Sequence, residues 1–421
     1  MTSFHLNLET RRRRFERGLR GASVLGCMLV ACSSDDGAAP APGAVDTEGP
    51  LYALGVRFVT ADTTVGYIVT VPSIEAGTTW NLDRAIEVGQ DAWLSGADGA
   101  GEVTLVSSRD PRVTRWRLGS DGALQLDAEL TFANLGLARS REARGRTAID
   151  VGDKAYFMSS DGQLVIWSPS DMAILGTIPW SLAPNLEPEG IFAGDEGRVL
   201  MTANLYRNDS ADTSIYRDDV HLVEIDPSTD QVISDVVEPR CNNLSAVSRA
   251  PNGTSYHSPR APVASYRVTL GEGHGPKDCS LRIMPASNGY DPGFDVSLSS
   301  LVGGRPAGGL FALNDDVAFI RVWHEELAPA LAADRSNFED LMFASAYQWW
   351  RWDIGSSAAE LVPGQLPTTG QWDPHQIDGR ALVPVIAADF SSTELIELFP
   401  DGEMRPLISG PGTLLGIVRV R

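Results

Sequence analysis

The sequence is poor in lysine and in long apolar runs, and both shortages restrict what the protein can be. Lys154 and Lys277 are its only lysines, and 34 basic residues face 55 acidic ones, for a formal net charge of −21. Such a charge argues against nucleic acid as a partner, because binding to phosphates needs an excess of lysine and arginine. The apolar stretch at 21–31 is shorter than the roughly 20 residues that a membrane-spanning helix needs. We therefore expect neither a nucleic-acid-binding protein nor a transmembrane helix.

Motifs of the common metal and catalytic sites are missing as well. The segment His324–Ala328 begins like a zinc-protease helix but lacks the second histidine. The acidic run at 208–219 lacks the spacing and the central glycine of a calcium-binding EF-hand, so we interpret it as a solvated loop. There is no glycine-rich phosphate loop and no nucleophile elbow. We therefore predict no cofactor, no metal site and no catalytic residue, and a non-enzyme is the favoured interpretation.

The first 31 residues are typical of an export signal. An arginine-rich segment precedes the apolar stretch at 21–31, which ends in Leu29-Val30-Ala31-Cys32. This ending resembles the bacterial lipobox, in which the cysteine thiol accepts a diacylglyceryl group and the new N-terminus a further acyl chain. Buried acyl chains contribute about 0.8 kcal/mol per CH₂ to membrane attachment. We predict a signal peptide at 1–31, lipidation at Cys32 and, because Ser33 rather than aspartate follows it, anchoring in the outer membrane; both Sec and twin-arginine export remain open.

Two boundaries follow the signal. Residues 32–50 are small, polar and proline-rich, which favours a flexible tether. From 51 to 421 the sequence pattern is uniform, so we take this range as one domain. The chain has four cysteines. Cys27 leaves with the signal and Cys32 takes lipid, so Cys241 and Cys279 remain. In an exported domain we expect these two to form a disulfide bond.

Between 51 and 421 short strand-like runs alternate with turns at a regular spacing. Most runs enter a tight turn, at residues 72, 119, 168, 226, 271, 355 and 400. A spacing near 45–58 residues is typical of β-propeller blades. A buried strand precedes each of the later turns, and the longer gap between 271 and 355 contains one such strand rather than two, so it is one blade with an insertion at 324–346. That insertion is the only place where apolar spacing predicts a helix.

The ends of this domain complement each other. Residues 51–90 supply only three strands, whereas 413–420 form a lone strand after the seventh repeat. A propeller must close its ring or leave strand edges exposed. We therefore predict an all-β, seven-bladed β-propeller whose C-terminal strand becomes the innermost strand of the first blade.

In propellers, ligands usually meet the loops that enter the innermost strands around the central channel. The residues at these entries are Asp91, Arg146, Glu189, Asn243, Arg305, Trp372 and His375. Their mixed chemistry suits an anionic or polyhydroxylated ligand, although polar residues also line such channels simply to hydrate them. We predict a ligand site at this channel mouth.

One of these positions has a specific resemblance. Glu187–Ile191, with its Pro-Glu-Gly, resembles the calcium-dependent lactonase and phosphotriesterase propellers, in which a channel carboxylate binds the metal that polarises a carbonyl. The resemblance implies Glu189 as the metal ligand, with Asn243 and Asp91 as partners. No His-Asp base pair accompanies it, so a calcium-dependent hydrolase is an alternative function.

The densest aromatic patch is at 349–352. Strand alternation places Trp350 and Trp352 on one face and Trp349 on the other. Blade packing accounts for two of these rings, and the third is open to ligand stacking.

With these features in hand, the chain resembles the lipoproteins encoded in myxochelin siderophore gene clusters. The similar stretches are 71–79, 349–353, 393–398 and 411–421. The resemblance implies a part in ferric-siderophore binding or uptake at the outer membrane, with a siderophore or its uptake machinery as partner. A surface scaffold for another protein is the second interpretation, because the insertion at 324–346 and the acidic segment at 204–219 should both project from the channel-mouth face.

Overall fold

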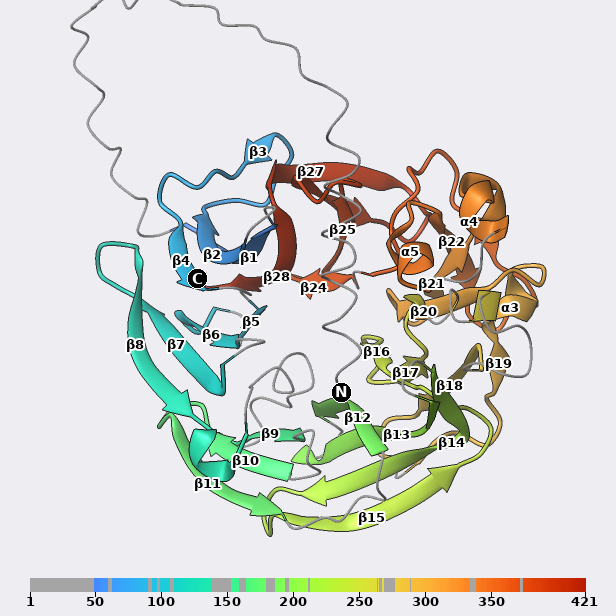
Figure 1. Ribbon diagram of the computed structural model, residues 1–421, viewed down its shortest axis with the longest axis horizontal. Helices are drawn as coiled ribbons and strands as arrows, with labels where there is room; N and C mark the ends of the chain where they lie inside the picture. Colours follow the sequence, from blue (N-terminus) through green and yellow to red (C-terminus); the bar gives the residue numbers. More distant parts are fainter. Residues whose placement is uncertain are drawn as a thin grey trace, which may run out of the picture.

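The alternating runs of the sequence fold into strands, and the strands form a ring of seven small sheets (Figure 1). The computed structural model describes residues 49–421 except 60–62, 90–92, 97–98, 107–109, 138–152, 159–163, 179–185, 194–196, 211–212, 263, 265–266, 269–276, 288, 334–337 and 372–373. The predicted signal peptide and Cys32 therefore lie outside the described residues. Within the described part of the chain, no helix is long and apolar enough to cross a membrane.

Each sheet is one blade, and the blades are numbered in chain order, with the strands of each named from the channel outward. Blade 1 contains β28 (Thr413–Arg419), β1 (Tyr52–Val59), β2 (Thr64–Val71) and β4 (Ile86–Gly89), and blade 2 contains β5 (Trp93–Ser95), β6 (Glu102–Val106), β7 (Arg112–Leu118) and β8 (Leu124–Thr131). The described strands of blade 3 are β9 (Ala155–Met158), β10 (Leu164–Ser168) and β11 (Ala173–Ile178), and blade 4 contains β12 (Leu186–Ala193), β13 (Val199–Ser210), β14 (Thr213–Asp226) and β15 (Gln231–Glu238).

The remaining three blades follow the same order. Blade 5 contains β16 (Ala246–Arg249), β17 (Ser255–Ser258), β18 (Cys279–Ile283) and β19 (Val296–Ser297), and blade 6 contains β20 (Ala307–Ala312), β21 (Val317–Trp323), β22 (Tyr347–Asp353) and β23 (Glu360–Leu361). Blade 7 contains β24 (His375–Ile377), β25 (Arg380–Ile386), β26 (Ser392–Leu398), β27 (Met404–Pro411) and, outermost, β3 (Thr78–Thr79). The all-β, seven-bladed propeller predicted from the sequence is confirmed.

The ring is closed by the two ends of the domain, as predicted. Strand β28 pairs antiparallel with β1, with Tyr52 opposite Arg419 and Arg57 opposite Thr413. A second connection lies on the outside of the ring, where β3 pairs in parallel with β27. The Trp80 indole then donates to the Pro411 carbonyl (3.1 Å), and Gly410 has no side chain because a Cβ there would overlap the Trp80 ring. Blades 1 and 7 are thus joined both inside and outside.

The hydrophobic core is divided into layers between neighbouring blades. One layer joins blades 7 and 1 around Leu54 and Leu395, and another joins blades 5 and 6 around Tyr256 and Trp352. Similar clusters fill the spaces between the other pairs of blades. Because each layer needs both of its blades, the stability of the ring depends on its closure.

Cations fasten some blades to their successors. In three seams a basic side chain donates to the carbonyl of a proline in the turn that follows a strand of the next blade. Arg115 bonds Pro169 (2.6 Å), Lys154 bonds Pro227 (2.8 Å) and Arg351 bonds Pro400 (2.6 Å). These prolines belong to the repeated turns of the sequence, so the repeat supplies the acceptors of the contacts between blades.

Five outer strands carry the same irregularity. In blades 1, 2, 3, 4 and 7 the outer strand contains one residue more than its neighbour at the equivalent place, which is a β-bulge. The extra residues are Val88, Asp127, Leu175, Ile233 and Leu407. A bulge strengthens the local twist of a strand, so this repeated bulge is part of the blade.

Two expectations about local structure are wrong. The run that enters the turn at 271 was expected to be a strand, but its described residues Arg267 and Val268 are helical, as are Pro262 and Ala264, and the third strand of the blade is β18. Ala261, Ala264 and Val268 are spaced by three and four residues, so a helix buries all three together. The acidic run at 208–219 is not a loop, because β13 and β14 extend through it as a hairpin with Tyr206 opposite Tyr216.

The helices are short. The predicted insertion contains η5 (Glu325–Leu327), α4 (Pro329–Ala333) and α5 (Phe338–Phe343), which confirms a helical segment there. It is not the only one, since η2 (Ala133–Leu135) and α3 (Leu298–Leu301) lie elsewhere. Ser297 caps α3 by accepting a hydrogen bond from the Ser300 amide, which satisfies an otherwise unpaired donor.

Candidate functional site

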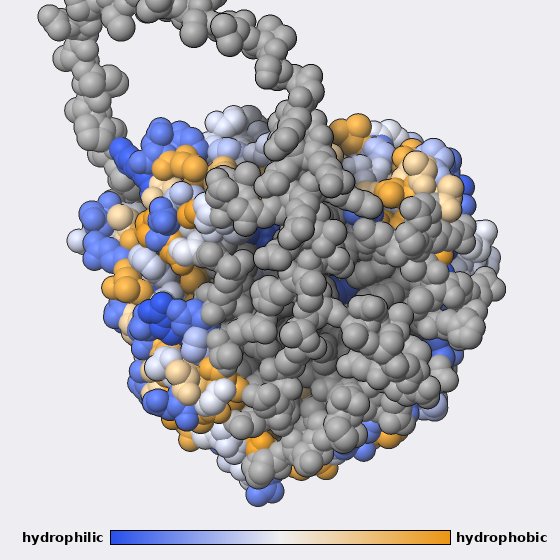
Figure 2. Space-filling view, in the orientation of Figure 1, coloured by the Kyte–Doolittle hydropathy of each residue, from blue (hydrophilic) through white to orange (hydrophobic). Residues whose placement is uncertain are grey.

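The two faces of the ring carry different connections. Strands within a blade alternate in direction, so the connections into the innermost strands and those between the second and third strands share one face, which we call the mouth face. The opposite face, the termini face, carries the ends of the domain, where the Leu51 amide donates to the Arg421 carbonyl (3.1 Å). Around the rim, the coloured surface in Figure 2 is a mosaic of hydrophilic and hydrophobic residues. The long connections at 259–278 and 324–346 both belong to the mouth face.

These two connections pack together into a cap over blades 5 and 6. Its buried cluster consists of Ala261, Ala264, Val268, Trp323, Leu341, Ala346 and Tyr347. The cap is held close to the innermost strand of blade 6, where the Gly309 amide donates to the Pro259 carbonyl (2.5 Å). A Cβ on Gly308 would come within 2.6 Å of the Arg260 carbonyl oxygen, so glycine is required there. At its other edge the cap reaches blade 7, where Phe343 packs edge-on against Phe390.

A polar chain runs along the cap from Arg305 to Trp350. Arg305 pairs with Glu326 (3.1 Å), Glu326 contacts His324 Nδ1 (3.1 Å), and the Trp350 indole reaches His324 Nε2 (3.1 Å). An indole N–H can only donate, so Nε2 accepts and the imidazole proton is on Nδ1, where it bonds Glu326.

The ionisation states of His324 and Glu326 follow from the same contacts. Burial lowers the pKa of His324, which therefore stays neutral. The hydrogen bond from Arg305, together with backbone and His324 hydrogen bonds, lowers the pKa of Glu326 to about 2. His324 thus has both ring nitrogens occupied, and it positions Trp350 rather than offering a free base.

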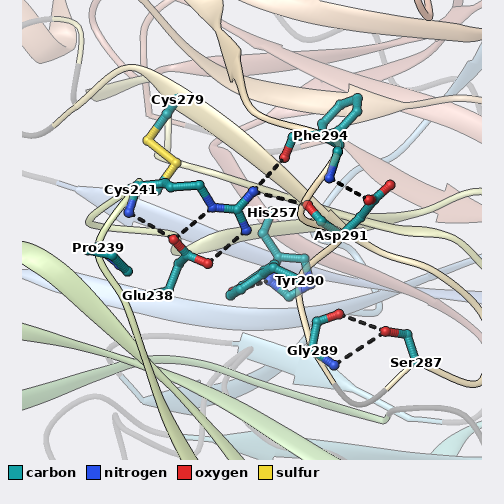
Figure 3. Close-up of polar contacts among 12 residues, drawn as sticks. Glu238, Pro239, Cys241, His257, Cys279, Ser287, Gly289, Tyr290, Asp291 and Phe294 are labelled. Atoms are coloured by element: carbon teal, nitrogen blue, oxygen red, sulfur yellow. Dashed lines mark hydrogen bonds and ion pairs between the residues drawn. A yellow bond between two sulfur atoms is a disulfide. The ribbon is translucent and has the colours of Figure 1, made fainter.

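A second polar cluster fixes the linker between blades 4 and 5 (Figure 3). The predicted disulfide between Cys241 and Cys279 is present, with the Cα atoms 5.8 Å apart. Next to it Arg240 holds Glu238 through two nitrogens, at 2.9 and 2.8 Å, and also donates to the carbonyls of Asp291 and Phe294. The linker that leads to the channel is therefore tied both to its own blade and to the turn at 284–295.

The next residues of the linker are fixed as well. The Asn242 side chain accepts from the Lys277 amide (2.6 Å), and Asn243 is buried with a positive φ of 53°. Its Oδ1 accepts from the Ser245 hydroxyl (3.0 Å). A side-chain amide tolerates this left-handed conformation better than most residues. Asn243 is held in place by these contacts.

A histidine–tyrosine pair lies beneath this cluster (Figure 3). The Tyr290 hydroxyl and His257 Nδ1 are 3.2 Å apart, and the rings meet edge-to-face. His257 is fully buried, and burial lowers its pKa to about 3, so it is neutral at physiological pH. Its carbonyl also accepts from Ser280 (3.0 Å). Nothing in the sequence pattern singles out this pair, because its partners are distant in the chain.

The structure places four of the seven predicted mouth residues. Asn243, Arg305 and His375 lie at the entries to the innermost strands of blades 5, 6 and 7, as expected from the repeat. The backbone of Glu189 lies in a bulge of β12, between the paired residues Pro188 and Gly190. The other three, Asp91, Arg146 and Trp372, lie outside the described residues.

The described contacts do not gather these residues into one metal site. Asn243, a predicted partner of Glu189, bonds Ser245 instead, and Arg305 bonds Glu326. Over the described ranges, no three His, Cys, Asp or Glu side chains converge as metal ligands would. Of the ligands that the Glu187–Ile191 resemblance implies, Asn243 is the one whose side chain is described, and Asp91 lies outside the described residues.

The tryptophan patch divides as alternation predicts. Trp352 is buried in the layer between blades 5 and 6, with Trp350 partly buried beside it, whereas Trp349 belongs to the layer between blades 6 and 7. The Arg321 guanidinium stacks over the Trp349 ring at 4.3 Å. Two of these rings are therefore core residues, and Trp350 is the one that reaches the cap.

Comparison with known proteins supports the fold. No protein-family model and no curated protein matches the chain. Its structure is similar to that of a candidate 6-phosphogluconolactonase from Bacteroides fragilis, with a TM-score of 0.54 and 11% identity over 90% of this chain and 99% of that one. It is also similar to a periplasmic gluconolactonase from Pseudomonas aeruginosa, with a TM-score of 0.53 and 13% identity over 88% of this chain and all of that one. At these identities the similarity shows the seven-bladed propeller fold and nothing finer.

Proposed function

We propose that this protein is a non-catalytic lipoprotein of the outer membrane that binds a ferric siderophore at its mouth face. The observation that carries the proposal is the opposition of the two faces. Strand β1 begins next to Arg421 on the termini face, so the described domain starts on the side opposite the cap. Anchored through Cys32, the ring turns its channel mouth and cap away from the membrane, toward a ligand.

The chemistry of the described mouth residues supports binding rather than turnover. Three acids of the cap and of the linker are held by arginines: Glu326 by Arg305, Asp278 by Arg267 and Glu238 by Arg240. A general base needs a free lone pair near the reacting group, and His324 has none. What the mouth presents instead is a guanidinium, that of Arg305, with 38% of its side chain exposed.

The anchor is tested on its own. Mass spectrometry of the membrane fraction should give an acylated N-terminal peptide that starts at Cys32. A Cys32→Ala chain should move to the soluble fraction, because it can accept no diacylglyceryl group. If that variant stayed equally membrane-bound, the anchor would lie elsewhere.

Ligand binding is tested by fluorescence titration with a ferric catecholate, since the chain has ten tryptophans. We expect saturable quenching at micromolar ligand. Arg305→Ala should weaken binding by about tenfold, the effect of losing about 1.4 kcal/mol. Arg405→Ala is the matched control, because Arg405 is also an exposed arginine paired with a glutamate, Glu403, but lies on an outer strand. Arg146→Ala tests the other predicted cation.

Two results would redirect the proposal. Absence of quenching, with wild-type behaviour of both mouth variants, would favour a surface scaffold that uses the cap to bind another protein. Calcium-dependent hydrolysis of a lactone, lost in Glu189→Gln, would favour the hydrolase. That second candidate is supported by the bulge that sets Glu189 apart in β12 and by the gluconolactonase among the structurally similar proteins.

A further inference from the structure

The linker between blades 4 and 5 holds Asn243 in a constrained backbone conformation. Its φ of 53° lies in the left-handed region, which residues other than glycine seldom adopt. Five of the other six described residues of this kind lie in connections between paired strands, where the chain has to reverse its direction. Asn243 lies instead at the entry to the innermost strand β16. Strained conformations of this sort are concentrated at sites that bind ligands.

The linker is fastened on both sides of Asn243. Before it, Cys241 is joined to Cys279 of blade 5 by the disulfide (Figure 3). After it, the Leu244 carbonyl accepts from the Thr202 hydroxyl of blade 4 (3.0 Å). The backbone that carries Asn243 is thus tied to both of the blades that it connects, so the side chain starts from a fixed position.

The side chain of Asn243 offers a donor. Its Oδ1 accepts from the Ser245 hydroxyl (3.0 Å), whereas its Nδ2 bonds none of the described residues. This nitrogen is also not one of the fully buried side-chain atoms that lack a partner, although the residue as a whole is only 3% exposed. Because the oxygen is engaged by Ser245, what Asn243 presents at the entry to β16 is a pair of N–H donors.

A fixed donor distinguishes the two states of a catecholate ligand. Oxygens bound to iron have lost their protons, so they can only accept hydrogen bonds and they carry negative charge. A catechol without iron keeps its hydroxyl protons at neutral pH, as a tyrosine does with its pKa of about 10. A hydrogen bond to an ionised acceptor is roughly twice as strong as one between neutral groups. The amide of Asn243 therefore favours the iron-loaded form.

We propose that Asn243 is a specificity-determining residue, through which the mouth selects the iron-loaded catecholate over the iron-free ligand. This inference rests on the proposed function and adds the choice between two states of the same ligand. Replacing the donor by an acceptor should remove that choice. An aspartate at 243 repels the oxygens of the ferric complex, but it accepts from the hydroxyls of the free catechol.

Isothermal titration calorimetry of the full chain carrying Cys32→Ala tests the proposal, with a ferric tris-catecholate and the same tris-catecholate without iron. We expect the parent to bind the ferric form about tenfold more tightly than the free one. Asn243→Asp should weaken binding of the ferric form by about 100-fold and change that of the free form by about threefold at most. Asn252→Asp is the matched control, because Asn252 belongs to the same blade but lies in the turn between β16 and β17, on the termini face.

Both variants should melt like the parent. Aspartate tolerates a positive φ and still accepts from Ser245, and the Asn252 oxygen accepts from the Thr254 amide (2.8 Å), as a carboxylate also can. Asn243→Gly is the second variant: glycine adopts this φ freely, and the loss of the amide should weaken ferric binding alone by about tenfold.

The outcomes separate this inference from the function on which it rests. A parent that binds neither form would overturn both. A parent that binds the ferric form, with its preference unchanged in Asn243→Asp and Asn243→Gly, would overturn the role of Asn243 and leave siderophore binding in place. An equal change of preference in Asn252→Asp would also overturn that role, because the effect would then be one of net charge.

Discussion

A chain that lacks residues 412–421 is expected to lose the cooperative unfolding transition of the intact ring. The deletion removes β28, which pairs with β1 and fills two core layers at once. The buried aliphatic side chains of the deleted segment are Leu414, Leu415, Ile417, Val418 and Val420. At about 2 kcal/mol for each buried aliphatic side chain, their loss approaches 10 kcal/mol. That is comparable to the whole stability of a typical domain, about 5–15 kcal/mol.

Circular dichroism during thermal and urea unfolding measures this effect. The control is Arg419→Gln in the full chain, which removes a partly exposed pair with Asp378 (2.7 Å) and a hydrogen bond to the Arg421 carbonyl (3.0 Å) but keeps the strand; the lost ion pair should cost about 1 kcal/mol or less. A truncated chain that melts within a few degrees of the parent would show that the ring holds without its closing strand, and that the layers around Leu54 and Ile68 stabilise themselves.

The closure could be predicted from the sequence because it depends on counting strands. Residues 51–90 hold three strands of a four-stranded unit, and the missing one is the last segment of the chain. The outer connection was not predictable in the same way. Strand β3 is only two residues long, and its pairing with β27 depends on Trp80 fitting over Gly410, which no local pattern records.

The error in blade 5 has a definite physical cause. The run at 266–271 alternates apolar and polar residues like a strand, but Ala261, Ala264 and Val268 also follow helical spacing. Burial against Trp323 and Tyr347 of the next blade decides between the two. Local alternation is a weak signal when the segment packs on a neighbouring blade rather than pairing within its own.

In the candidate site, too, the positions of the residues could be predicted from the sequence but their contacts could not. The positions of Asn243, Arg305 and His375 follow from the repeat, since an entry to an innermost strand is fixed by topology. Their partners do not follow from it. The contact of Arg305 with Glu326, and of His324 with Trp350, exists only because the insertion of blade 6 folds back over its own strands.

Replacing Arg240 with methionine should produce the second-largest loss of stability, about 3–5 kcal/mol at neutral pH, because it leaves a buried acid without its partner. Glu238 has 10% of its side chain exposed, and Arg240 is its only described cationic contact within hydrogen-bonding distance (Figure 3). The substitution also removes the donors to the Asp291 and Phe294 carbonyls. Arg405→Met is the matched control, because the Arg405–Glu403 pair is exposed on both sides and should contribute at most about 1 kcal/mol.

The dependence on pH separates this charge effect from lost packing. Burial alone would raise the pKa of Glu238, but the hydrogen bonds and charge of Arg240 outweigh it and hold that pKa below its ordinary value of 4.5. The stabilisation is therefore complete above pH 4.5 and is lost as the pH falls through the lower folded-state value. In the variant, Glu238 is buried without a cation, so protonation removes the cost of its unpaired charge. Urea unfolding of both proteins from pH 7 to pH 3 should show their free energies of unfolding converging at the acid end. A difference that stayed constant across this range would mean that Arg240 acts through its packing and carbonyl contacts, with Glu238 contributing nothing.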